Sequence, residues 1–204
     1  MSLIKGSVSL TRYTVLDQPP DVTDEFISQH LRNNAFMDIE GTTEEESVGW
    51  VEVLDPLQVV FEPVSFRFGP AVAMTLRVDT RKVSAKTVNR YFALAEMQAE
   101  AAGQKPRTAD ERRTLKLKVR QDLLMRTPIN TDVFEVVWMP GEAEVWLTAV
   151  SSKMRERFED LWRQTFKMGL LMKIPWVLAQ QKLPKGKTSQ DLDQLKPHAW
   201  LSGR

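Results

Sequence analysis

The feature that most constrains the fold is a series of five β-prone segments, with one long helical stretch between the third and the fourth. Each segment is rich in β-branched and aromatic residues and is bounded by turn formers, which is typical of strands. The five segments are VSLTRYTVL (8–16), GWVEVL (49–54), VAMTLRVDT (72–80), VFEVVWM (133–139) and EVWLTAV (144–150). The last two predict a β-hairpin, because Pro140 and Gly141 separate them at a length that suits a tight reversal.

Two amphipathic helices are predicted outside the long helical stretch. Residues 21–36 (DVTDEFISQHLRNNAF) place apolar side chains near helical spacing, with acidic residues in the first turn. Residues 151–166 (SSKMRERFEDLWRQTF) also place apolar side chains on one side, and they begin at a serine suited to capping. Strands and helices do not alternate strictly. The sequence therefore favours an α+β fold, with an antiparallel or mixed sheet and helices on one of its faces.

The long helical stretch is predicted to form two helices. The first, SAKTVNRYFALAEMQAEAAG, has Ser84 as a plausible N-cap and Gly103 as a C-terminal stop. The second, TADERRTLKLKVRQDLLMR, begins with Thr108 and Glu111 at the spacing of a capping box. Because the connection between the two helices is so short, we expect them to run antiparallel as an inserted helical hairpin.

These patterns divide the chain into three parts. We expect an α+β body formed by residues 1–83 and 127–180, an inserted basic helical hairpin over residues 84–126, and a tail over residues 181–204. The tail is basic and polar and has few apolar residues to anchor it, so we expect it to be flexible.

Composition narrows the class of protein. The chain has 204 residues, of which 42% are hydrophobic and 27% charged, as in an ordinary globular protein. Because the sequence has no cysteine, it cannot form a disulfide framework, a thiolate zinc site or a cysteine nucleophile. It has no apolar run of the roughly 20 residues that span a bilayer and no signal peptide at its N-terminus, so we expect a cytoplasmic protein with no membrane partner.

Charge is distributed unevenly along the chain, although the formal net charge is only +1. Residues 40–56, which we call the acidic segment, carry only negative charges, whereas the second helix of the predicted hairpin is mainly basic. Four of its cations form what we call the basic ridge: Arg112, Arg113, Lys116 and Arg120.

The basic ridge is the main candidate for binding DNA. Arg112, Lys116 and Arg120 are spaced four apart and therefore lie on one side of a helix, where like charges repel. A polyanion would relieve this repulsion and release counterions, and helix-borne cations would hold phosphates without reading bases. The other predicted DNA-binding residues are Lys105 and Arg107 at the hairpin tip. The secondary candidates, on the approach to the hairpin, are Arg77, Arg81, Lys82, Lys86 and Arg90.

Two ordinary explanations compete with DNA binding. The basic ridge has the pattern of a solvated helix face, with Asp110, Glu111 and Asp122 reducing its charge. Cations near the third strand, Arg77 among them, have acidic neighbours such as Asp79 with which to form salt bridges.

No catalytic constellation is recognisable in the sequence. A metal-dependent nuclease needs converging carboxylates, and the candidates are Glu40, Glu44, Glu45, Glu46 and Asp79. The glutamate run lies beside glycine and threonine, so a solvated loop is the better explanation. Neither His30 nor His198 pairs with a recognisable nucleophile. We therefore expect a protein that is not an enzyme and that uses no metal or cofactor.

Exposed tryptophans can serve as stacking platforms for unpaired bases. Trp138, Trp146 and Trp162 fall within strand or helix patterns and are predicted to lie in the core, and Trp50 is predicted to be structural. The candidates for exposed stacking residues are Trp176 and Trp200 near the C-terminus.

The order of these elements resembles the bacterial recombination-associated RdgC family. The resemblance rests on the succession VGWV, LRVDTRKVSAKTVNRYF, VRQDLLMR and VVWM…VWLTAVSSKMRERFEDLWRQTF, and it covers roughly residues 13–175. Better-known members are longer, so we expect a shortened member that lacks much of their C-terminal part.

The resemblance implies a nucleoid-associated protein that contacts double- and single-stranded DNA with little sequence preference. It also implies a protein that restrains RecA-dependent strand exchange and forms a homodimer, closed into a ring with a basic inner surface in better-known members. Because this chain is shorter, ring closure does not follow from the resemblance.

Three hypotheses follow, in order. The first is a non-enzymatic, nonspecific DNA-binding protein that uses the basic ridge and limits the access of recombination proteins to DNA. The second is a protein-interaction or self-assembly module in which the hairpin pairs with an acidic surface, such as the acidic segment of a second copy. The third is a metal-dependent nuclease.

Overall fold

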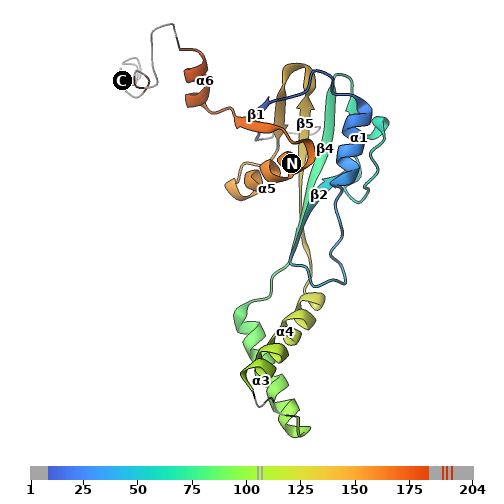
Figure 1. Cartoon of the computed structure of the whole chain (residues 1–204), viewed down its shortest axis with the longest axis vertical. Coiled ribbons are helices and arrows are strands. Elements are labelled where there is room, and N and C mark those ends of the chain that lie inside the picture. The colour runs from blue at the N-terminus through green and yellow to red at the C-terminus, as the bar shows by residue number, and fades with distance from the viewer. Residues whose placement is uncertain are drawn as a thin grey trace, which may run out of the picture.

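One curled antiparallel sheet forms the centre of the molecule (Figure 1). The computed structural model describes residues 9–104, 106, 108–183, 190, 192 and 194. The strand order is β2-β4-β5-β6-β1-β7, with β3 paired to β4 beyond the end of β2, and all ladders between these strands are antiparallel. The strands are β1 (Thr11–Leu16), β2 (Glu46–Val51), β3 (Arg67–Phe68), β4 (Ala71–Thr80), β5 (Asn130–Met139), β6 (Glu144–Leu147) and β7 (Gly169–Met172).

The predicted α+β class with an antiparallel sheet is confirmed. All five predicted strands are present, but the one expected at residues 49–54 begins and ends three residues earlier, because Glu46 to Val51 pair with Thr80 to Thr75 and the chain then turns. The predicted β-hairpin joins β5 to β6 through a 3-10 turn at Pro140–Glu142, and Ala143 adopts a left-handed conformation (φ 48°). Strands β3 and β7 were not predicted.

Two amphipathic helices cover one face of the sheet. Helix α1 (Asp24–Asn33) is capped by the Thr23 side chain, and helix α5 (Ser152–Phe166) is capped by Ser151. The two helices contact each other, and α5 also contacts β2 and β7. The helices expected over residues 21–36 and 151–166 are therefore confirmed. Two further short helices are α2 (Pro63–Phe66) and α6 (Pro175–Gln181), and α6 lies apart from the sheet (Figure 1).

Aromatic side chains hold α5 against the sheet. Trp138 of β5 meets Trp162 edge to face, with ring centroids 5.1 Å apart, and it also contacts Phe166. Trp50 of β2 packs edge to face on Phe158, and its Nε1 donates a hydrogen bond of 2.8 Å to Thr165 Oγ1. The predicted core positions of Trp50, Trp138 and Trp162 are confirmed, since each has no exposed surface.

Trp146 does not lie in the core, so its predicted placement was wrong. Its neighbours along β6, Val145 and Leu147, are buried on the face that α1 and α5 cover. Because successive strand residues point to opposite faces, Trp146 points to the other face, where its Nε1 donates a hydrogen bond of 2.6 Å to Glu144 Oε1. A pattern of β-branched and aromatic residues identifies a strand but does not show which of its faces is covered.

Glu144 anchors a polar cluster beside Trp146. Its carboxylate accepts hydrogen bonds from Arg12 Nε at 2.6 Å, from Trp146 and from Lys173, and its side chain is only 7% exposed. Burial raises the pKa of Glu144, but the hydrogen bonds from Lys173, Trp146 and Arg12 outweigh it and lower that pKa to about 2. The cluster ties β6 to β1 and to the end of β7.

We predict that Glu144→Gln lowers the free energy of unfolding by about 3 kcal/mol at pH 7. This value is the lowering of the Glu144 pKa converted to free energy at about 1.4 kcal/mol per pKa unit. A carboxyl with a lowered pKa stabilises the fold above its unfolded value and loses that contribution as the pH falls through its folded value. Wild type should therefore lose stability between about pH 4.5 and 2, and the variant should lose less. Denaturant unfolding at several pH values measures both, with the exposed Glu142→Gln as control. Equal stability of the two variants would contradict this role of Glu144.

A close backbone approach closes the edge of the sheet beside β2. Phe36 N donates to Trp50 O at 2.9 Å, and Trp50 N donates to Asn34 O at 3.1 Å. A Cβ atom added to Gly49 would lie 2.4 Å from Phe36 Cα. The space exists only because residue 49 is glycine.

We predict that Gly49→Ala destabilises the protein by about 2 kcal/mol, because backbone atoms must move to relieve the overlap. Thermal unfolding measures the loss. Gly141→Ala is the matched control, since an added Cβ there meets nothing within 4 Å. If both variants unfold at the temperature of wild type, the close approach is unimportant.

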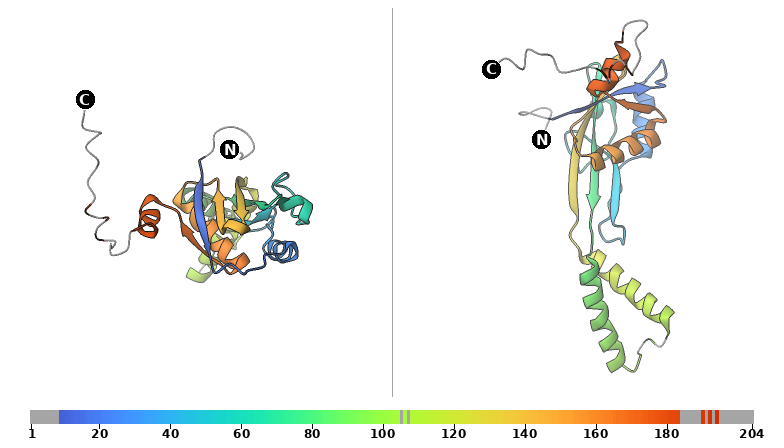
Figure 2. Two further views of the ribbon diagram at one scale, coloured as in Figure 1. Left: turned by 90° about the horizontal axis from the view of Figure 1, so that it is seen from above. Right: turned by 90° about the vertical axis from the view of Figure 1, so that its left-hand side faces the viewer.

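Two long helices extend away from one end of the sheet between β4 and β5 (Figures 1 and 2). They are α3 (Ala85–Ala101) and α4 (Ala109–Arg126), and they contact each other. Val88 and Leu124 are the buried residues of the two helices within the described chain. The division of the chain into body, inserted hairpin and tail stays a prediction, and most of the predicted tail lies outside the described residues.

Candidate nucleic-acid interface

Local capping sets the direction and register of both projecting helices. Ser84 accepts a hydrogen bond of 3.1 Å from Thr87 N at the start of α3. At the start of α4, Thr108 Oγ1 accepts from Glu111 N at 3.2 Å and Thr108 N donates to Glu111 Oε2 at 3.3 Å. This capping box places the first cation of the basic ridge, Arg112, in the first turn of α4.

Two cations of the basic ridge turn toward α3. Arg112 Nε lies 2.8 Å from Glu96 Oε1, and its guanidinium carbon lies 5.8 Å from the centre of the Phe92 ring. Lys116 Nζ lies 5.9 Å from the same ring. Stacking on an aromatic face leaves the outer edge of each cation open to solvent. Arg112, Arg113 and Lys116 are all exposed residues.

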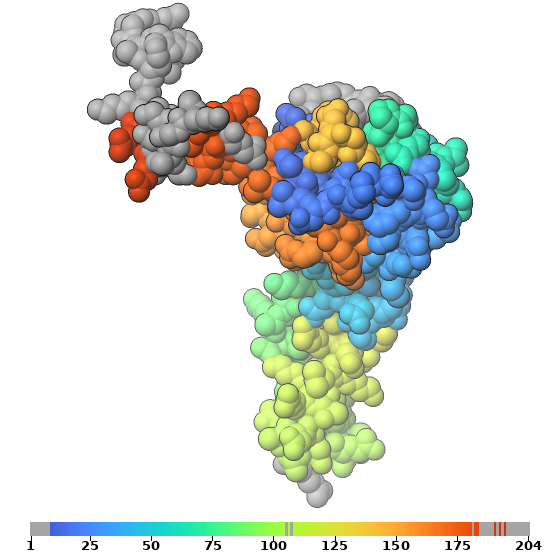
Figure 3. Space-filling view, turned by 45° about the horizontal axis from the view of Figure 1, so that its top comes forward, coloured from blue at the N-terminus to red at the C-terminus, as the bar shows by residue number. Residues whose placement is uncertain are grey.

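Arg120 at the other end of the basic ridge reaches the body. Its guanidinium forms an ion pair with Glu45, which precedes β2 and belongs to the acidic segment. Figure 3 shows this part of the chain, in light blue, lying against the yellow-green α4. The side chains of Arg120 and Glu45 are 50% and 43% exposed, so the pair contributes at most about 1 kcal/mol. An incoming anion can therefore displace Glu45 at little cost.

The remaining predicted DNA-binding residues differ in their availability. Lys82, Lys86 and Arg90 are exposed near the start of α3. Arg81 is only 5% exposed, and its guanidinium donates to the backbone carbonyls of residues 39, 42 and 44. We therefore leave it out of the proposed contact set. Lys105 and Arg107 lie outside the described residues.

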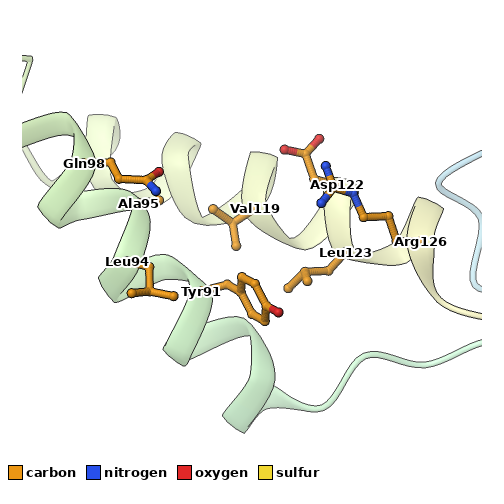
Figure 4. Close-up of a pocket in the computed structure, with 8 residues that line it drawn as sticks. All are labelled: Tyr91, Leu94, Ala95, Gln98, Val119, Asp122, Leu123 and Arg126. Atoms are coloured by element: carbon orange, nitrogen blue, oxygen red, sulfur yellow. The ribbon is translucent and has the colours of Figure 1, made fainter. Parts of the chain in front are cut away.

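A half-open groove runs between the two projecting helices (Figure 4). Tyr91 and Leu94 of α3 face Val119 and Leu123 of α4 across a cavity of about 290 Å³, and Arg126 lies at one end. Tyr91 and Leu94 remain 46% and 45% exposed. The helices are therefore held by a thin apolar contact and by the Arg112–Glu96 ion pair rather than by a closed core.

Three of the five acidic residues predicted as nuclease candidates, Glu45, Glu46 and Asp79, form ion pairs with arginines. Asp79 is buried, and its carboxylate accepts a hydrogen bond of 2.7 Å from Arg77 Nη2. Arg77 therefore forms the salt bridge that was predicted as the alternative to DNA binding. Glu46 accepts from Arg157 Nε at 2.6 Å, and this hydrogen bond lowers the pKa of Glu46. In the part of the chain that the structure describes, no three His, Cys, Asp or Glu side chains gather as a metal site. None of the described helices is both long and apolar enough to cross a bilayer.

The fold and the candidate site define an α+β protein from which a pair of helices projects and carries a basic ridge. A family model with the description "Putative exonuclease, RdgC" matches residues 10–183. The chain belongs to the RdgC family. A search of curated proteins found no match.

Proposed function

We propose that this protein is a nonspecific DNA-binding protein of the nucleoid that limits the access of a RecA-type recombinase to DNA, and that it is not an enzyme. The observation that carries the proposal is the placement of the basic ridge on helices that project from the body, with acidic partners, Glu96 and Glu45, whose side chains are 25% and 43% exposed. Family membership supports a role in recombination.

Contact with the phosphates of DNA would explain why the cations of the basic ridge lie on a projecting helix. A helix with cations along one side can approach the backbone of DNA without the body of the protein obstructing it. The contacts exchange weak surface ion pairs for phosphate contacts, and the release of counterions drives binding. Such contacts carry no direct information about base sequence, so little sequence preference is expected.

Binding without cleavage fits the described residues better than a nuclease does. The words "Putative exonuclease" belong to the family description. Of the carboxylates considered for a metal site, Glu45, Glu46 and Asp79 pair with arginines. A protein that coats DNA would restrict strand exchange by occupying the phosphates that a recombinase must also contact.

We predict that the triple substitution Arg112→Gln, Arg113→Gln and Lys116→Gln weakens binding to duplexes of any sequence. Each lost phosphate contact should reduce the slope of log K against log salt by about 0.9, so that three contacts reduce it by about 2.7. Fluorescence anisotropy with two labelled duplexes of unrelated sequence, over a salt series, measures both effects.

The matched control changes three exposed cations outside the projecting helices by the same charge: Arg163→Gln, Lys167→Gln and Lys182→Gln. It should bind nearly as wild type does. Equal losses in the two triple variants would show that only net charge matters and would contradict the basic ridge as the contact site.

Self-assembly is the second candidate function, and one observation favours it. Large apolar side chains of the projecting helices are exposed, among them Tyr91, Leu94, Met97, Leu117 and Met125. Exposed apolar patches of this kind mark interaction sites.

If the helices associate, we expect Met97→Gln and Leu117→Gln to raise the dissociation constant of the oligomer at least tenfold while leaving the fold intact. Analytical ultracentrifugation without DNA measures the association, and circular dichroism checks the fold. Met37→Gln is the control, since Met37 is 77% exposed on the body. If neither substitution on the projecting helices changes the dissociation constant, the protein does not associate through this surface.

A further inference from the structure

A polar cleft lies where the projecting helices join the body, and we call it the junction cleft. Its cavity has a volume of about 520 Å³. The start of β2, the end of β4, the segment between α4 and β5, and the start of α5 each contribute to its walls. The lining residues include Glu45, Glu46, Thr80, Lys82, Asn130 and Lys153.

Cations approach the junction cleft from three elements. Lys82 follows β4, Lys153 lies in the first turn of α5, and both are exposed. Arg120 of α4 reaches it through its ion pair with Glu45, which lines the cleft. Arg81 also lines the cleft, but its guanidinium is engaged by the carbonyls of residues 39, 42 and 44. The other three cations attract an anion with several oxygen atoms, and among them Arg120 presents the fork that binds two oxygens at once.

The two acidic residues of the junction cleft differ in how firmly they are held. Glu46 is fixed by Arg157, whose side chain is only 13% exposed. Glu45 touches Arg120 with a half-exposed side chain, whereas its backbone is anchored, since Arg81 N donates to Glu45 O at 2.9 Å. The Glu45 side chain can therefore swing away from Arg120 without any movement of the chain around it.

We propose that the junction cleft binds one phosphate group of the DNA backbone between Arg120, Lys82 and Lys153, and that the Glu45 carboxylate occupies the phosphate position in the absence of DNA. This inference rests on the proposed DNA-binding function and deepens it. A carboxylate and a phosphate present oxygens to arginine in the same way, so each can replace the other on Arg120. DNA would then contact the root of α4 and the body together.

Arg81 acquires a supporting role in this arrangement. Its buried guanidinium holds the carbonyls of residues 39, 42 and 44, and its own amide holds Glu45. Arg81 thus lines the junction cleft and positions the acidic segment beside α4.

The test is the substitution Glu45→Gln, with binding to a labelled 20-base-pair duplex followed by anisotropy over a salt series. Removal of the competing carboxylate should tighten binding about two- to fivefold, the range that corresponds to a surface ion pair. The slope of log K against log salt should steepen by up to about 0.9, because the Glu45 carboxylate displaced in wild type takes up a cation and so offsets one of the cations that DNA releases. Glu44→Gln is the control, since Glu44 is an exposed neighbour with the same charge.

A second pair of substitutions tests the lysines. Lys82→Gln with Lys153→Gln in the Glu45→Gln background should return the salt slope to a value below that of wild type. Amine-reactive footprinting read by mass spectrometry should also show that DNA protects Lys82 and Lys153 but not Lys167. Labelling of Lys82 and Lys153 that DNA leaves unchanged would overturn the proposal.

The outcomes separate this inference from the proposed function. If wild type binds DNA and Glu45→Gln binds as Glu44→Gln does, the junction cleft is not a phosphate site, although DNA binding by the basic ridge stands. If no variant binds DNA at low salt, both proposals fail.

Discussion

The packing of α5 on the inner face of the sheet is the interaction on which the rest of the structure depends. Trp162 and Phe166 meet Trp138 of β5, while Phe158 meets Trp50 of β2 and Tyr13 of β1, so one helix joins strands from both halves of the sheet. Burial of side chains of this size contributes several kcal/mol. The resulting body holds the last residue of β4 beside the first residue of β5. Helices α3 and α4 lie between these two residues in the chain and project from this point.

The projecting helices are held by weaker interactions than the body. They bury little apolar surface, and Arg112, Lys116 and Arg120 place repelling charges on one side of α4. Acidic partners on α3 and on the acidic segment offset that repulsion through exposed pairs. Weak, exposed pairs are suited to exchange with an external polyanion, whereas the buried pairs of Asp79 and Glu144 serve the fold alone.

Local signals could be predicted from the sequence, and distant pairings could not. The caps at Ser84 and Thr108 depend on residues three positions away, so spacing alone identified them. Strand β7 has only four residues and gains its place by pairing with β1, which lies far away in the chain. Glu45 and Arg120 are 75 residues apart in the chain. The sequence shows that the acidic segment and the basic ridge have opposite charges, but it does not show that they meet within one chain. The burial of Arg81 likewise depends on carbonyls of a distant loop.

The measurement that tests the central claim most directly is the binding of the unmodified protein to a labelled duplex, followed by fluorescence anisotropy at several salt concentrations without added metal. The account predicts binding that is independent of sequence and that weakens steeply as salt rises, because phosphate contacts release counterions. Absence of binding at low salt, or affinity that does not change with salt, would contradict it.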